Sequence, residues 1–210
     1  MTRHSEIATR LPPWLRTARR WLPCALATLL LLALQAGGEP LRLALRFERA
    51  AVLDGQWWRL FGAHAVHLSP AHCLLNIAGL WLAAAWTPGG LGACALLARW
   101  LLLGGGISVL LLVATPVPDY VGLSGVLYGL FVIALLPQAL RRDGPAALAL
   151  AGVAGWAAWQ WLAGPAAAEE RLVGGHIVAA AHLAGMTLAL AWLGARRLAA
   201  PFASFFRTSS

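Results

Sequence analysis

The chain has 210 residues, of which 60% are hydrophobic and only 11% are charged, whereas a soluble domain carries about 25% charged residues. This composition excludes an ordinary soluble domain and predicts a membrane protein built as one compact helical bundle, surrounded by lipids. Every basic residue is an arginine, and the formal charge is +8. Because the arginines gather at the ends of apolar segments, we read them as topology signals and expect no nucleic acid as a partner.

Six apolar segments are predicted to be helices that cross the membrane. They cover residues 21–36, 70–86, 91–113, 124–140, 146–162 and 176–193. The first resembles a signal peptide but lacks a good cleavage site, so we expect it to be retained. Residues 37–66 form a long connection of mixed charge. There, Trp57, Trp58 and Arg59 are typical of the interfacial belt of a membrane.

Six spans would place both termini on one side of the membrane, and the arginines favour the cytoplasm for that side. On it lie eleven arginines: Arg3, Arg10, Arg16, Arg19, Arg20, Arg99, Arg141, Arg142, Arg196, Arg197 and Arg207. The opposite side has five: Arg42, Arg46, Arg49, Arg59 and Arg171. The sequence therefore predicts an all-α membrane protein with six transmembrane helices and both ends inside. We divide it into a cytoplasmic segment 1–20, a helical domain 21–195 and a cytoplasmic tail 196–210.

The segment 121–129, VGLSGVLYG, places a serine between glycines at the start of the fourth helix. Gly122 allows a tight turn before the helix, because glycine tolerates backbone torsions that other residues avoid. Ser124 then lies in the first helical turn, where free N–H groups and the positive end of the helix dipole suit a developing oxyanion. Ser124 is thus placed like a nucleophile. Gly125 and Gly129 form a face of small residues that lets another helix approach closely.

A partner for this serine is found in the sixth helix. His182 lies within an apolar span, where a histidine is a functional candidate by default. Ala181 and Gly185 give this helix a small face of its own, and contact between the two faces would bring His182 to Ser124. The imidazole would take the hydroxyl proton and later return it to the leaving amine. No acidic residue lies within any span, so we predict a Ser124–His182 dyad without an orienting carboxylate.

Further polar residues are predicted to support this dyad. His72 and Asn76 are four residues apart and share one face of the second helix. We expect them to stabilise the oxyanion together with the N–H groups of Leu123 and Ser124. Tyr128 lies one turn after the serine and could pack on the imidazole.

These elements resemble the rhomboid family of intramembrane serine proteases. The matching motifs are Trp58-Arg59-x-Phe61, His67-x4-His72-x3-Asn76, Gly122-x-Ser124-Gly125-x-x-Tyr128 and Ala181-His182-x-x-Gly185. The resemblance spans about residues 21–195. It implies a six-helix bundle in a bacterial inner membrane, with the Ser124–His182 dyad below the membrane surface in a water-filled cavity open to the periplasm. It also implies that the loop after the fifth helix covers the site, and that this helix acts as a side gate.

Within that family the chain looks most like a rhombosortase. The similarity lies in residues 46–59 and 122–129. It implies a transmembrane protein substrate with small residues at the cleavage site, specifically a secreted or surface protein with a C-terminal Gly-Gly sorting tail that the enzyme cleaves. In one departure, His64 and His67 are three residues apart, where many rhomboids space the pair by four, so the role of His64 stays open.

Three alternatives remain. The first is a general rhomboid protease with other transmembrane substrates, and the second is a non-catalytic relative that binds membrane helices. Such relatives usually lack the serine or the histidine. The third is a metal-dependent enzyme using the histidines, but no His-Glu-x-x-His motif is present. Cys24, Cys73 and Cys94 lie in apolar stretches without zinc or disulfide spacing. We therefore expect neither a metal nor a cofactor.

Overall fold

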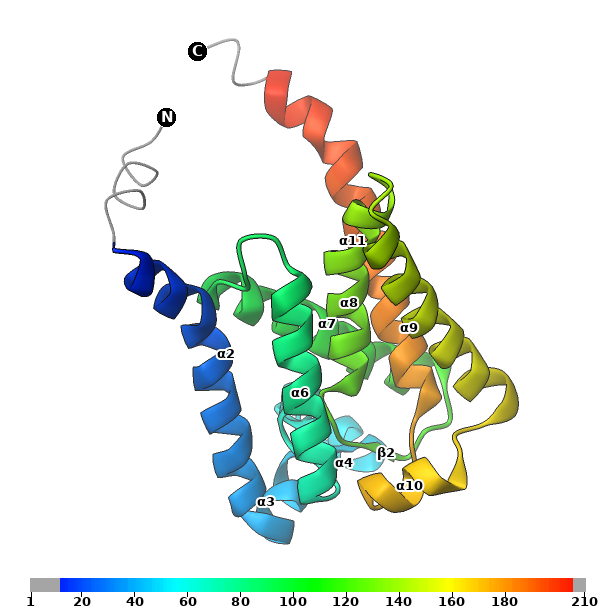
Figure 1. The fold of residues 1–210 in the computed structure, drawn as a ribbon. Helices are drawn as coiled ribbons and strands as arrows, with labels where there is room; N and C mark the ends of the chain where they lie inside the picture. Colours follow the sequence, from blue (N-terminus) through cyan, green and yellow to red (C-terminus); the bar gives the residue numbers. More distant parts are fainter. Residues whose placement is uncertain (1–11, 206–210) are drawn as a thin grey trace.

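The computed structural model describes residues 12–205, and within them six long helices form a bundle (Figure 1). They are α2 (Pro13–Ala36), α6 (Pro70–Trp86), α7 (Ala93–Ala114), α8 (Ser124–Ala139), α9 (Gly144–Ala163) and α11 (Ala179–Phe205). Each corresponds to one of the six predicted segments. The helices α2 and α11 extend past the apolar runs into the polar ends, and a proline opens α2, as first helical turns tolerate. The predicted terminal segments 1–20 and 196–210 lie partly outside the described residues.

Length and hydropathy confirm a membrane protein but fewer certain spans than six. Among the described helices, α7 and α9 are each long and apolar enough to cross a bilayer. Two bent helix pairs raise the number to four: residues 18–36 with α3 (Gly38–Leu45), bent by 110°, and residues 59–65 with α6, bent by 91°. The apolar α8 is shorter. The count of six spans and the cytoplasmic location of both ends stay predictions, although the start of α2 and the end of α11 lie at the same end of the bundle (Figure 1).

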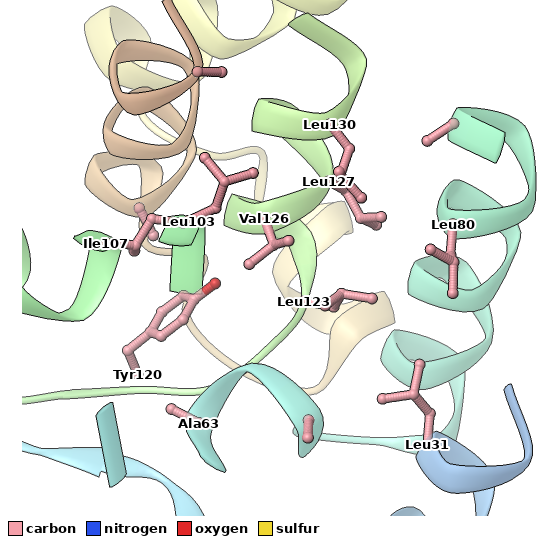
Figure 2. Packing of buried hydrophobic residues seen from close by; sticks show 14 of the residues in the cluster. Leu31, Ala63, Leu80, Leu103, Ile107, Tyr120, Leu123, Val126, Leu127 and Leu130 are labelled. Carbon is pink, nitrogen blue, oxygen red and sulfur yellow. The ribbon is translucent and has the colours of Figure 1, made fainter. Parts of the chain in front are cut away.

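The helix α8 is the centre of the fold and packs against α6, α7, α9 and α11. Its sequence is apolar on every side, which is typical of a helix surrounded by protein. Figure 2 shows side chains from several elements meeting around it, including Leu80 of α6 and Ile107 of α7. Because α8 is enclosed in this way, the residues at its start are held by many neighbours.

The segment 37–66 is not the plain connection that we predicted. It folds into α3, β1 (Phe47–Glu48), α4 (Arg49–Leu53), α5 (Arg59–Gly62) and the 3₁₀ turn η1 (Ala63–Ala65). The strand β1 pairs antiparallel with β2 (Asp119–Tyr120), with Phe47 opposite Tyr120 and Glu48 opposite Asp119. These elements lie at the end of the bundle opposite the start of α2 (Figure 1). They were missed because each is too short to produce a periodic pattern.

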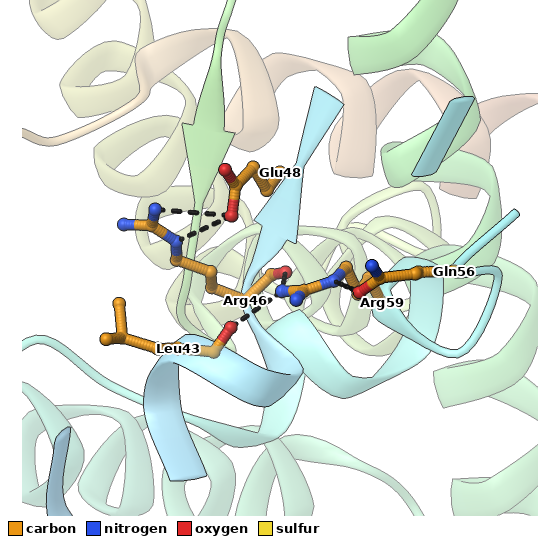
Figure 3. Close-up of polar contacts among 5 residues, drawn as sticks. All are labelled: Leu43, Arg46, Glu48, Gln56 and Arg59. Atoms are coloured by element: carbon orange, nitrogen blue, oxygen red, sulfur yellow. Dashed lines mark hydrogen bonds and ion pairs between the residues drawn. The ribbon is translucent and has the colours of Figure 1, made fainter. Parts of the chain in front are cut away.

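Arg59 stabilises this compact segment from within, and the interfacial position that we predicted for it stays a prediction. Its side chain is only 8% exposed. The guanidinium donates to the carbonyls of Leu43 (2.7 Å) and Arg46 (2.9 Å) and to Oε1 of Gln56 (2.7 Å), as Figure 3 shows. A guanidinium offers five donors in a planar fork, so Arg59 can join the end of α3 to the turn that precedes α5. Trp57 and Trp58 are exposed, as residues of an interfacial belt would be.

A second arginine fixes the chain just before the serine motif. The guanidinium of Arg49 donates to the carbonyls of Leu111 and Leu112 (both 2.6 Å), Val117 (3.1 Å) and Thr115. It therefore satisfies carbonyls that the end of α7 leaves without helical partners. Since β2 follows directly, Arg49 helps to set the position from which the chain enters α8.

Candidate active site

The turn that delivers Ser124 is held at three points. Gly122 has a φ of +124°, a conformation that favours glycine. Its N–H donates to the carbonyl of Ala63 (2.9 Å), and its carbonyl accepts the hydroxyl of Tyr120 (2.7 Å). A Cβ at Gly122 would come within 2.9 Å of Nε2 of His72. Glycine is thus required here by backbone conformation and by space, and Ser124 becomes the first residue of α8.

The two residues of the predicted dyad lie in hydrogen-bond contact. Nε2 of His182 is 2.9 Å from Oγ of Ser124. His182 is in the first turn of α11 and only 5% exposed. The ring of Tyr128 stacks on the imidazole, with ring centres 4.3 Å apart and an angle of 24° between the planes. The stacking restricts rotation of the imidazole, which keeps Nε2 directed at the hydroxyl.

Close approach of two helices produces this contact. A Cβ at Gly125 would lie 2.9 Å from the carbonyl oxygen of Ala181, and one at Gly129 would lie 2.8 Å from that of Gly185. A Cβ at Gly185 would overlap the carbonyl of Gly125. The backbones of α8 and α11 therefore touch, as the two small faces predicted.

Ser124 lines a cavity of about 300 Å³. Its polar lining comes from α6, β2, α8, the segment around α10 (Ala167–Val173) and α11: His72, Asn76, Tyr120, Ser124, Tyr128, Glu169, His176 and His182. The apolar lining includes Leu75, Val121 and Trp156. A reacting peptide bond placed at the hydroxyl of Ser124 would thus meet polar groups from several helices.

His72 and Asn76 lie beside the glycine turn. The N–H of Leu68 donates to Nδ1 of His72 (3.4 Å). Because Nδ1 accepts, the neutral ring carries its proton on Nε2, which lies on the side of the ring that faces Gly122. The amide nitrogen of Asn76 donates to the carbonyl of His72 (3.1 Å) and has a second proton available. Both residues therefore hold donors beside the glycine turn that leads into Leu123 and Ser124.

A short lid, residues 164–175, covers one side of the cavity and contains α10. Gly164 and Gly174 have φ values of +79° and +85° and turn the chain at its two ends. Glu170, within the lid, contacts two residues that follow it. Its Oε1 accepts the N–H of Ile177 (3.2 Å) and contacts Nδ1 of His176 (3.1 Å). The bond from Ile177, and secondly that from His176, lower the pKa of the Glu170 carboxyl. The end of the lid is thereby tied to the segment that enters α11.

Sequence reasoning missed a residue behind the imidazole. Oε1 of Gln160 lies 2.9 Å from Nδ1 of His182, and the side chain of Gln160 is 4% exposed. We had looked only for a carboxylate within the spans, whereas this neighbour is a neutral amide on α9. The signal was present, because a glutamine in an apolar helix is costly unless it has a partner. Tyr120 was missed as well, since its contact with Gly122 depends on the strand pair.

The remaining histidines have separate contacts. Nε2 of His64 is 3.0 Å from Oγ of Ser108, so in this fold His64 joins η1 to α7. The ring of His67 lies edge-on to that of His72 at 5.0 Å. Among residues 12–205, no three His, Cys, Asp or Glu side chains are grouped as metal ligands would be.

Comparison with known proteins gives one match. The model of a protein family described as "Rhomboid domain" matches residues 54–197, which is more than half of the chain. The matched region runs from the end of α4 into α11 and includes every lining residue of the cavity. No curated protein matches the chain.

Proposed function

Because the chain belongs to the rhomboid family, whose members are typically intramembrane serine proteases, we propose that it is a serine endopeptidase with Ser124 and His182 as its catalytic dyad. The observation that carries the proposal is the 2.9 Å contact between Nε2 of His182 and Oγ of Ser124. It is the distance at which a general base can take the proton of an attacking hydroxyl.

The reaction begins when Oγ of Ser124 attacks the carbonyl carbon of the scissile peptide bond. Nε2 of His182 takes the hydroxyl proton as the C–O bond forms. The tetrahedral intermediate collapses, the C–N bond breaks, and His182 gives its proton to the leaving amine. The N-terminal part of the substrate remains as an ester on Ser124. Water, deprotonated by His182, attacks this ester, and the proton returns to Oγ as the acid product leaves.

The negative charge that develops on the carbonyl oxygen needs donors already in position. We assign this role to the side chains of His72 and Asn76 and to the N–H groups of Leu123 and Ser124. The support is that His72 and Asn76 line the cavity and lie beside the glycine turn, which leads directly into Leu123 and Ser124. The positive end of the α8 dipole acts in the same direction.

We propose that the enzyme resides in a bacterial inner membrane and opens to the periplasm, with Ser124 at the outer end of α8. The arginine distribution supports this orientation. The substrate would be a transmembrane protein with small residues at the cleavage site. A cavity of about 300 Å³ that is lined by five helices suits small side chains. The similarity of residues 46–59 and 122–129 to rhombosortases favours a C-terminal Gly-Gly sorting tail.

Labelling with a serine-reactive fluorophosphonate probe tests the chemistry. The wild-type protein in detergent is expected to be labelled, and the variant Ser124→Ala is expected to lose the label. Ser108→Ala is the matched control, because Ser108 is a buried serine that contacts His64 and does not line the cavity. Equal labelling of folded Ser124→Ala and wild type would refute Ser124 as the nucleophile.

A pair of reporters tests the substrate class. One reporter carries a periplasmic domain followed by Gly-Gly, an apolar helix and a basic tail, and in the other Leu-Leu replaces Gly-Gly. We expect cleavage of the first alone. Equal cleavage of both, or cleavage of unrelated transmembrane reporters only, would favour a general rhomboid protease.

A further inference from the structure

Gln160 is hydrogen-bonded on both sides of its amide group. Its Oε1 faces Nδ1 of His182 at 2.9 Å, and its Nε2 donates to Oε2 of Glu169 at 3.4 Å. Glu169 belongs to α10, and the same oxygen accepts the N–H of Ala166 at 3.3 Å. A continuous chain of contacts therefore leads from the lid through Gln160 to His182 and Ser124.

The chemistry of these groups gives the chain a direction. A carboxylate only accepts hydrogen bonds, so Glu169 requires the NH₂ group of Gln160. The amide oxygen must then face His182, and an oxygen can only accept, so Nδ1 of His182 carries the proton. The neutral imidazole has one proton, which leaves a lone pair on Nε2. That lone pair is the acceptor that the hydroxyl of Ser124 needs.

We propose that Gln160 is a positioning residue that holds His182 in its reactive tautomer, and that Glu169 on the lid sets the orientation of the Gln160 amide. This inference rests on the proposed protease function and adds a control to it. When the lid covers the cavity, Glu169 holds the amide and the dyad is competent. When the lid moves away, the amide can rotate by half a turn and present NH₂ to Nδ1. That orientation stabilises the tautomer with its proton on Nε2, which cannot accept the proton of Ser124.

This arrangement would couple catalysis to closure. Substrate enters while the lid is open and the dyad is inactive, and closure over the bound substrate restores the base. An open, water-filled site is then protected from unproductive attack by Ser124 on passing peptides.

The first experiment compares Gln160→Leu with Gln138→Leu. Gln138 is also a glutamine in an apolar helix, but it donates to the carbonyls of Trp86 (2.9 Å) and Ala134 (2.7 Å) on α6 and α8. We expect Gln160→Leu to lower kcat by about ten- to a hundredfold, with little change in KM because Gln160 does not line the cavity. Gln138→Leu is expected to keep kcat. Wild-type kcat in Gln160→Leu would overturn the inference.

The second experiment tests the direction of control by rescue. Glu169→Ala frees the Gln160 amide to rotate, so we expect it to lower kcat. A carboxylate has no donor face, so Gln160→Glu offers Nδ1 an acceptor in either orientation. The double variant Gln160→Glu/Glu169→Ala should therefore recover kcat relative to Glu169→Ala alone. If the double variant is as slow as Glu169→Ala or slower, the lid does not act through this amide.

A spectroscopic readout separates the inference from the proposed function. The ¹⁵N chemical shifts of His182, in protein labelled at histidine, distinguish protonated from unprotonated ring nitrogens. We expect a protonated Nδ1 in the wild type and a mixture of tautomers in Gln160→Leu. If the wild type neither cleaves nor reacts with the serine probe, the proposed function fails while these shifts still decide the tautomer. If the wild type is active and the shifts of Gln160→Leu equal those of the wild type, the inference alone fails.

Discussion

The two helices that flank His182, α8 and α9, are packed very differently in this bundle. On one side, α8 and α11 touch through their backbones, and glycines at positions 125, 129 and 185 leave no room for a side chain. On the other side, α9 exposes most of its residues, and a Cβ at its exposed Gly152 or Gly155 would meet nothing within 4 Å. The buried residues of α9 are only Ala146, Ala157 and Gln160, and Trp156, Trp159 and Trp161 are exposed.

This difference assigns separate tasks to the two helix pairs. The contact between α8 and α11 fixes the distance between Ser124 and His182, because two touching backbones cannot shift without overlap. Although α9 packs along α8, it buries only three of its own residues, so we expect α9 and the lid that follows it to move at lower cost than the contact between α8 and α11. Under the proposed function, the chemistry would depend on the contact between α8 and α11, and substrate access would depend on α9 and the lid. Gln160 contacts His182 from α9.

Removing either member of the dyad is the strongest test of the contact between α8 and α11. Ser124→Ala and His182→Ala should each lower turnover by about 10⁶. The two residues act as a unit, so the double variant should be no slower than the single ones. Turnover is measured with the Gly-Gly reporter in proteoliposomes, and circular dichroism checks that each variant is folded. Substantial turnover by His182→Ala would remove the contact between α8 and α11 from the chemistry.

The oxyanion donors that we propose on α6 should matter less than the dyad. His72→Ala and Asn76→Ala are each expected to lower kcat by about 10²–10³, because their donors act on charge that forms only in the transition state. KM should change little. Steady-state kinetics on the same reporter gives both constants. An unaltered kcat in the double variant His72→Ala/Asn76→Ala would exclude both side chains from the oxyanion site.

A valine at Gly185 of α11 and a valine at Gly155 of α9 compare the packing of these two helices. Gly185→Val must displace the carbonyl of Gly125, and a shift on the order of 1 Å at the dyad costs about a hundredfold in rate. We also expect a lower melting temperature. Gly155→Val is the matched control, a helical glycine with open space around it. A loop glycine such as Gly89 would be a poorer control, because its φ of +76° strains any side chain.

The two valine variants are compared by thermal unfolding and by turnover. If Gly155→Val loses as much stability as Gly185→Val, the packing of the two sides does not differ as described.

Acid should slightly weaken the contact between the end of the lid and the segment that enters α11. Contacts with Ile177 and, secondly, His176 lower the pKa of Glu170 below the ordinary value of a glutamate carboxyl. A carboxyl whose pKa is lower in the folded protein stabilises it above the unfolded pKa, and that contribution is lost as the pH falls through the folded value. Because the Glu170–His176 pair is at the surface, the loss of stability in acid is modest.

Hydrogen exchange at the amide of Ile177 measures this loosening. Protection in the wild type should decrease as the pH drops below about 4.5, relative to the intrinsic exchange rate. Glu170→Gln removes the titrating group, so its protection should be lower at neutral pH and independent of pH in that range. Identical profiles for wild type and Glu170→Gln would show that this carboxylate does not hold the lid.

The sequence by itself determined the class of the protein and the centre of its candidate site. Long apolar runs predicted the six long helices, because hydrophobic periodicity and composition are local properties that survive in any tertiary context. The face formed by Gly125 and Gly129, and that formed by Ala181 and Gly185, predicted the contact between α8 and α11. Close backbone approach needs small residues at fixed helical spacing, so a short motif contains the information.

Only the tertiary structure decided which residues contact the dyad and the turn that precedes Ser124. Gln160 meets His182 across 22 positions of sequence, and the direction of its side chain depends on how α9 packs, which no local pattern records. Arg59 looked like an interfacial residue, but its acceptors are carbonyls of a segment whose fold has no periodic signal. The turn at Gly122 likewise depends on Tyr120 of β2, which β1 holds by strand pairing, and on Ala63 of η1. Polar contacts are directional and join distant segments, so they are settled only when the chain is packed.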